Sequence, residues 1–189
     1  MAWATYLLLA VNTAIYGILA SQSVTPIQID RRYMALLGME PHAFLAGAYW
    51  QVITSAFVHF DLPHLGYNMV FLAFFGSRAE ELYGSRRTLG LYLILGSCTS
   101  LASLLYPSGI SAGASGAIFG LLGLVLVASR NLYPRGIWTS LLYGFVLFVL
   151  ASATGFIAHI AGLVLGLVMG GWITRDWYPP EVQEDSPPA

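Results

Sequence analysis

Long segments that are almost free of charge dominate this chain and limit what it can fold into. A helix that crosses a bilayer needs about 20 mostly apolar residues. Hydrophobic residues make up 57% of the chain and charged residues only 9%, whereas a soluble domain carries about 25% charge. We therefore predict an all-α membrane protein, a bundle of six transmembrane helices within residues 1–175. The six predicted spans are residues 2–20, 63–79, 88–106, 114–129, 136–151 and 155–174.

Two segments between and after these spans differ in character. Residues 21–61 contain prolines, charges and the aromatic pair Tyr49 and Trp50. Because Trp and Tyr favour the headgroup level of a membrane, this first loop is expected to be partly helical and to lie at the interface. Residues 176–189 are acidic and rich in proline, which predicts a disordered cytoplasmic tail. The first span has no basic residues before it, so we interpret it as a retained helix rather than a signal peptide.

The arginines predict the orientation of the bundle. All eight basic residues are arginine, and the net charge of −1 argues against a nucleic-acid partner. Only Arg31 and Arg32 fall in loops on one side of the six spans. The other side carries the remaining six, Arg78, Arg86, Arg87, Arg130, Arg135 and Arg175. Because cytoplasmic loops are enriched in basic residues, we predict a multi-pass protein of a prokaryotic plasma membrane with both termini in the cytoplasm.

Two polar residues lie beside stripes of glycine in the fourth and sixth spans. Ser115 opens the fourth span, which continues with glycines at positions 116, 120 and 123. His159 precedes Gly162, the first of three glycines spaced four residues apart. Stripes of small residues allow helix backbones to approach closely, so the serine oxygen and the imidazole are predicted to reach hydrogen-bond distance. Serine is a weak nucleophile without such a base. Taken singly, each residue also fits an ordinary helix interface.

His64 and Asn68 are four residues apart on one face of the second span. They are suitable donors for the negative charge that develops on a carbonyl oxygen during peptide hydrolysis; hydrogen bonding between helices is the other reading. The sequence places no acidic residue at the depth of His159. The predicted chemistry is thus a Ser–His dyad, with Phe119 a candidate to stack against the imidazole and packing of the core as its alternative role.

Three motifs in order resemble those of the rhomboid family of intramembrane serine proteases. GASG at residues 113–116 resembles the GxSG motif, and AHIAG at 158–162, followed by Gly166, resembles AHxxGxxxG. WQVITSAFVH at 50–59 with HLGYNM at 64–69 is similar to the signature of the first loop and second helix. The resemblance covers roughly residues 45–171. Gln51 stands where the family often has arginine, and Phe119 where tyrosine is common.

This resemblance implies roles for particular residues. Ser115 matches the nucleophile, His159 the base, and His64 and Asn68 the oxyanion residues. His59 matches a loop histidine that supports the fold. The supporting glycines Gly113, Gly116 and Gly162 belong to the two short motifs. The resemblance also implies cleavage of transmembrane protein substrates, within surrounding lipid and without a metal or cofactor.

Two other classes of function remain as alternatives. A catalytically inactive rhomboid-like protein that binds membrane clients usually lacks the serine or the histidine, and this chain has both. A small transporter or channel would be expected to show inverted repeats or buried acids at the midplane, and the sequence shows neither. The substrates, the oligomeric state and the regulation are left open by the sequence.

Overall fold

The computed structural model describes residues 3–105, 109–132 and 156–173 of the chain, and these residues are mostly helical. The described residues contain no β-strand and only two isolated β-bridges. In the order of the chain the elements are α1 (Ala4–Ser21), α2 (Arg31–Leu37), α3 (Pro41–Leu45), α4 (Gln51–Thr54), the 3-10 turn η1 (Ser55–Phe57), α5 (Leu62–Tyr83), α6 (Ser85–Ala102), the 3-10 turn η2 (Ser103–Leu105), α7 (Ser115–Leu132) and α9 (Phe156–Ile173).

The long helices coincide with five of the predicted spans. Three described segments are long and apolar enough to cross a membrane, namely Ala4–Ser21, Ser85–Leu105 and Phe156–Ile173, and Ser115–Ser129 is a shorter apolar helix. The chain is therefore an integral membrane protein built from helices. The predicted fifth span, 136–151, and the predicted tail, 176–189, lie outside the described residues, so the count of six spans stays a prediction.

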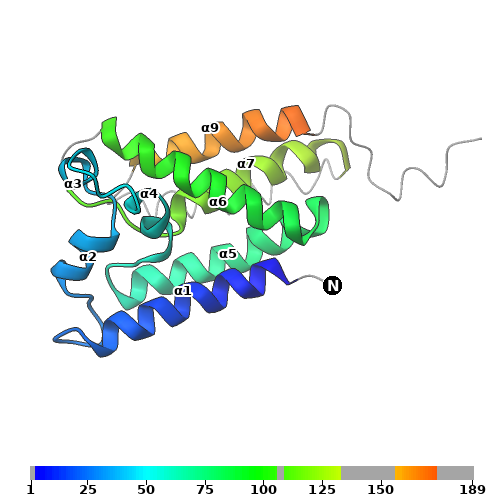
Figure 1. The fold of residues 1–189 in the computed structure, drawn as a ribbon. Helices are drawn as coiled ribbons and strands as arrows, with labels where there is room; N and C mark the ends of the chain where they lie inside the picture. Colours follow the sequence, from blue (N-terminus) through cyan, green and yellow to red (C-terminus); the bar gives the residue numbers. More distant parts are fainter. Residues whose placement is uncertain (1–2, 106–108, 133–155, 174–189) are drawn as a thin grey trace, which may run out of the picture.

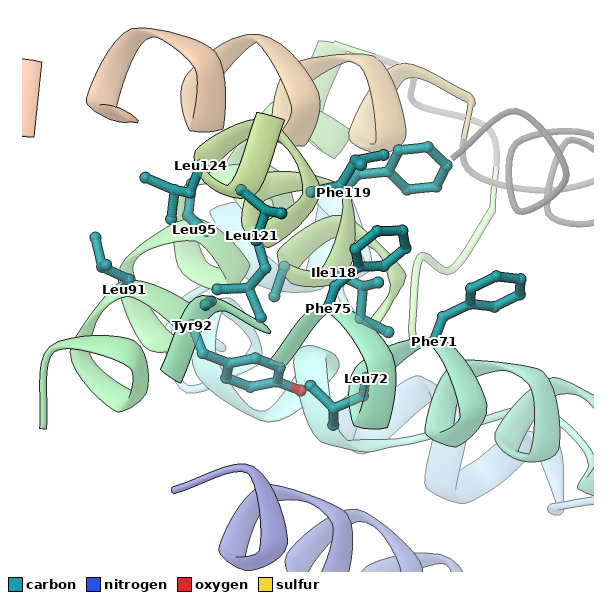
Figure 2. Close-up of a cluster of buried hydrophobic side chains, with 14 of the residues drawn as sticks. Phe71, Leu72, Phe75, Leu91, Tyr92, Leu95, Ile118, Phe119, Leu121 and Leu124 are labelled. Atoms are coloured by element: carbon teal, nitrogen blue, oxygen red, sulfur yellow. The ribbon is translucent and has the colours of Figure 1, made fainter. Parts of the chain in front are cut away.

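Helix α7 forms the centre of the bundle. Residues 114–126 are all buried, as expected for a helix that is apolar on every side. Side chains of α5 and α6, among them Phe75 and Leu95, pack against α7 in one buried cluster (Figure 2). On its opposite side, α7 packs along α9 (Figure 1). The helix that begins with Ser115 is thus held from several directions.

Helix α5 continues beyond the span predicted to end at Ala79, because a buried carboxylate follows. Glu80 is 4% exposed and binds the start of α1. Its carboxylate accepts hydrogen bonds from the backbone N–H groups of Trp3 (2.6 Å), Ala4 (2.8 Å) and Thr5 (2.9 Å), and from the Thr5 hydroxyl (2.6 Å). The first N–H groups of a helix lack partners within that helix, so Glu80 stabilises the start of α1 and joins it to α5.

The first loop folds into the short helices α2, α3 and α4, which gather at the end of the bundle away from the start of α1 (Figure 1). Gln51 stabilises this loop from within. Its side chain is 1% exposed, accepts a hydrogen bond from the Glu40 backbone at 3.0 Å and donates one to the Ala35 carbonyl at 2.9 Å. The residue that departs from the family pattern therefore still anchors the loop. Tyr49 and Trp50 are 65% and 50% exposed, and their place in the membrane interface stays a prediction.

Candidate active site

Ser115 and His159 meet between α7 and α9. The Oγ atom of Ser115 lies 2.8 Å from Nε2 of His159. The two residues are 8% and 2% exposed. Ser115 is the first residue of α7, and His159 lies in the first turn of α9. A buried alcohol thus lies at hydrogen-bond distance from an imidazole nitrogen, the arrangement that a serine nucleophile and its base require.

The two helices approach so closely because glycines face backbone across their interface. A Cβ atom added to Gly162 would collide with the carbonyl oxygen of Gly116, and one added to Gly166 would collide with that of Gly120. A Cβ on Gly123 would lie 2.6 Å from the Leu163 carbonyl oxygen. Any larger side chain at these positions would separate the backbones. The glycine stripes therefore set the distance between the helix that carries Ser115 and the helix that carries His159.

Packing orients the imidazole of His159. Its ring stacks on Phe119, with centroids 4.7 Å apart and planes at 22°. The Nδ1 atom is buried and has no hydrogen-bond partner among the described residues. If Nε2 accepts the serine proton, Nδ1 must carry the ring hydrogen. In a reaction that uses this pair, stacking on Phe119 would take the orienting role that a carboxylate has in a catalytic triad.

His64 and Asn68 lie on α5 and face the segment that leads into α7. The His64 ring is 2.7 Å, through Nε2, from the position that a Cβ on Gly113 would occupy, and Asn68 Nδ2 is 3.9 Å from it. The backbone N–H of Phe60 approaches His64 Nδ1 at 3.4 Å. Since Nδ1 accepts, Nε2 of a neutral His64 carries the hydrogen and is a donor on the side of Gly113.

Asn68 has spare hydrogen-bonding capacity. Its Nδ2 atom donates to the His64 carbonyl at 2.8 Å within α5. A side-chain amide carries two hydrogens, so one is left for a ligand. Its Oδ1 atom is buried without a partner in the described part of the chain. The predicted oxyanion residues thus lie together beside Gly113, and each has a donor hydrogen that is not bonded within α5.

His59 lies behind the candidate site. It is fully buried, and its Nε2 atom accepts a hydrogen bond from the backbone N–H of Ala114 at 3.4 Å. Burial, with a smaller contribution from the neighbouring His64, lowers the pKa of His59 to about 3. His59 is therefore neutral at physiological pH. It contacts the backbone before Ser115 rather than the hydroxyl itself.

Three polar residues near the site were not singled out by the sequence. Thr99 of α6 lies against both glycines that flank the dyad, so a Cβ on Gly116 would collide with Thr99 Oγ1 and one on Gly162 would lie 3.2 Å from its Cγ2. Ser100 of α6 pairs with Ser55 of η1, with their Oγ atoms 2.7 Å apart. Small hydroxyl residues are common in membrane helices, so their spacing carried no signal that distinguished them.

A comparison with known protein families covers the part of the chain that carries these residues. The Rhomboid domain matches residues 46–176 of the chain. The protein is thus a helical membrane bundle with a buried serine–histidine pair. The matched domain covers both residues of that pair. The chain belongs to the rhomboid family.

Individual relatives are similar to this chain over most of its length. It is 31% identical over 173 residues to the rhomboid protease GluP of Bacillus subtilis strain 168, covering 86% of this chain and 33% of that protein. It is 29% identical over 135 residues to the rhomboid protease GlpG of Serratia proteamaculans strain 568, and 28% identical over 138 residues to that of Yersinia pestis strain Pestoides F. Each of those two matches covers 67% of this chain and 49% of the relative.

Proposed function

We propose that the protein is a serine endopeptidase that cleaves transmembrane proteins within or next to their membrane helices. The observation that carries the proposal is the 2.8 Å separation between Ser115 Oγ and His159 Nε2 in a buried site. Membership of the rhomboid family and the similarity to rhomboid proteases support the same reaction class.

The proposed reaction begins with the transfer of the Ser115 proton to His159. Ser115 Oγ then attacks the carbonyl carbon of the scissile peptide bond, and the carbonyl oxygen becomes negatively charged. His159 passes its proton to the leaving amine, which departs and leaves an acyl-enzyme. A water molecule, deprotonated by His159, then hydrolyses the ester and restores the serine. The proposed mechanism uses no metal and no cofactor.

The oxyanion would be stabilised at the start of α7. His64 Nε2–H and the free amide hydrogen of Asn68 are side-chain donors, and the backbone N–H of Ser115 is a third. The positive end of the α7 dipole adds to them. Donors of this kind typically lower the barrier by about 3–4 kcal/mol each.

The substrate in this proposal is a polypeptide that reaches the site from the surrounding lipid. A peptide bond inside an intact helix has its carbonyl hydrogen-bonded along the axis, so the substrate must unwind before Ser115 can attack. We place its entry between α5 and the predicted fifth span, with water arriving from the outward end. Cytoplasmic termini belong to the same proposal.

The test is cleavage of a model transmembrane substrate by the purified protein in lipid. Ser115→Ala and His159→Ala are each expected to abolish cleavage, because each removes one half of the dyad. Matched controls are Ser129→Ala, a buried serine at the far end of α7, and His42→Ala, an exposed histidine in α3. Both controls are expected to cleave at the wild-type rate.

A fluorophosphonate probe supplies a second measurement. It should label the wild-type serine and fail to label Ser115→Ala. Cleavage that persists in either dyad variant would refute the assignment of the residues. A wild-type protein that neither cleaves nor reacts with the probe would instead favour the inactive, client-binding alternative.

A further inference from the structure

The first loop holds the backbone that leads into the candidate nucleophile. Met39 and Ser111 exchange two backbone hydrogen bonds, of 2.8 and 2.9 Å. The N–H of Gly113 donates to the Ser55 carbonyl at 2.8 Å, and the N–H of Ala114 to His59 Nε2 at 3.4 Å. Two successive amides immediately before Ser115 are thus bound to the segment 55–59.

That segment is in turn attached to α6 by two buried side chains. Tyr92 donates its hydroxyl hydrogen to the Ala56 carbonyl at 3.0 Å. Ser100 Oγ lies 2.9 Å from the Gly96 carbonyl, to which only the serine can donate. A hydroxyl has one hydrogen. Ser100 therefore donates to Gly96 and accepts from Ser55, whose Oγ is 2.7 Å away.

The contacts form a continuous path from α6 to the site. It runs from Ser100 to the side chain of Ser55, then from the Ser55 carbonyl to Gly113 and, two residues later, to Ser115. Ser55 and Ser100 are 2% and 7% exposed, so water does not compete freely for these bonds. Two steps of the path are hydrogen bonds, and the other two are covalent. Removing either serine hydroxyl breaks the first hydrogen bond, which is costly in a buried site.

We propose that Ser55, Ser100 and His59 are positioning residues, an inference that rests on the proposed function. They set the place of Ser115 through the backbone of Gly113 and Ala114. None of the three is a catalytic residue, because none contacts the reacting atoms. Their effect is geometric, because the restrained backbone of Gly113 and Ala114 fixes the positions of the Ser115 hydroxyl and of its backbone N–H. A misplacement of about 1 Å in such a site can lower the rate about 100-fold.

The inference is tested by a double-mutant cycle on Ser55→Ala and Ser100→Ala in the full-length protein. Each single variant is expected to lower kcat about tenfold with KM nearly unchanged, and to lower the thermal unfolding midpoint because a buried hydroxyl loses its partner. The double variant should lose no more than either single one, because both remove the same contact. Ser103→Ala is the matched control, since Ser103 is also 7% exposed and lies near the same end of α6. It is expected to keep the wild-type kcat.

His59 provides an independent arm of the experiment. His59→Gln keeps an acceptor that can reach the Ala114 N–H, whereas His59→Leu does not. Partial rescue of kcat and of the fluorophosphonate labelling rate in the glutamine variant is expected. Equal losses in both variants, or additive losses in the serine cycle, would overturn the positioning role. If the wild-type protein itself does not cleave, the proposed function is refuted instead. Failure of the positioning role and failure of the proposed function are therefore distinguishable.

Discussion

Ser115 owes two chemical properties to its place as the first residue of α7. The first N–H groups of a helix have no partner within it, so the Ser115 amide is a candidate donor to the oxyanion of the proposed reaction. The positive end of the helix dipole also favours negative charge there. His159, by contrast, is oriented by the ring of Phe119. In the proposed mechanism, a helix end and a stacked ring therefore stand in for an acidic third member, and among the described residues no acidic side chain is hydrogen-bonded to Nδ1 of His159.

Gly113 gives the first prediction, at the residue scale. Its φ of +117° is disfavoured for other residues, and a Cβ there would lie 2.7 Å from His64 Nε2. Gly113→Ala combines backbone strain with a collision inside the site. We expect it to lower the free energy of unfolding by about 1–3 kcal/mol and to reduce cleavage about 100-fold.

A matched variant separates the two causes. Gly47 has a similar φ of +110° but open space around it. Gly47→Ala should therefore show the strain, measured by thermal unfolding, while cleavage stays close to wild type. Equal activity of the two variants would show that the close spacing of Gly113 and the His64 ring does not matter for the site.

Among the helices, one buried carboxylate and the glycine stripes of α7 and α9 determine how neighbouring elements fit together. The carboxylate of Glu80 receives four hydrogen bonds from the start of α1. The glycines of α7 and α9 interlock further along the bundle. One contact is polar and the other is purely steric, so they predict different responses to substitution.

Glu80→Gln is expected to destabilise the protein by about 2 kcal/mol or more. The amide nitrogen of glutamine would replace one of the two carboxylate oxygens. Its hydrogens would face hydrogen-bond donors at the start of α1, and those donors would lose their acceptor. Thermal unfolding in detergent measures the effect. Glu81→Gln is the control, because Glu81 is 60% exposed in an ion pair with Arg78 and should cost less than about 1 kcal/mol. Equal costs would contradict the proposed joint between α5 and α1.

Gly166→Ala tests the close approach of α7 and α9. The new methyl group would collide with the Gly120 carbonyl, so α9 must move and carry His159 away from Ser115. Overpacking of this kind costs about 1–3 kcal/mol, and cleavage should fall with it. Gly171 of the same helix has open space, and Gly171→Ala should preserve both stability and cleavage. A fully active Gly166→Ala protein would argue against the glycine contact as the determinant of the site.

At the scale of the whole molecule, the first loop and the starts of α5, α7 and α9 share one end of the bundle (Figure 1). That end contains the candidate site, and the distribution of arginines predicts that it lies outside the cytoplasm. The proposed function therefore predicts a reaction near the outer face of the membrane. The orientation of the chain can be measured independently of activity.

Labelling of introduced cysteines tests this orientation. The chain has one cysteine, Cys98, which Cys98→Ser removes as a background. Val24→Cys, at a first-loop position that is 91% exposed, should react with a membrane-impermeant maleimide on intact cells. Glu81→Cys, at the exposed opposite end of α5, should react only after lysis. The reverse pattern would invert the predicted topology.

Much of this fold and candidate site follows from local features of the chain. Apolar length predicts where a helix crosses the membrane, and the positions of the described long helices agree with it. The glycine spacing on either side of Ser115 and His159 predicts that two helices approach, because helical period is a local property. The end of α5 could not be predicted in this way, because Glu80 is charged and its hydrogen-bond partners lie in α1.

Hydrophobic length and residue type predict the helical membrane class and the residues suited to the chemistry, because neither depends on which groups are neighbours in space. Which groups meet depends on how the helices pack. Ser55 and Ser100 are 45 residues apart in the chain, and Thr5 and Glu80 are 75 apart. Hydrogen bonds act over about 3 Å, so these pairs exist only once the packed helices have brought their atoms within that distance.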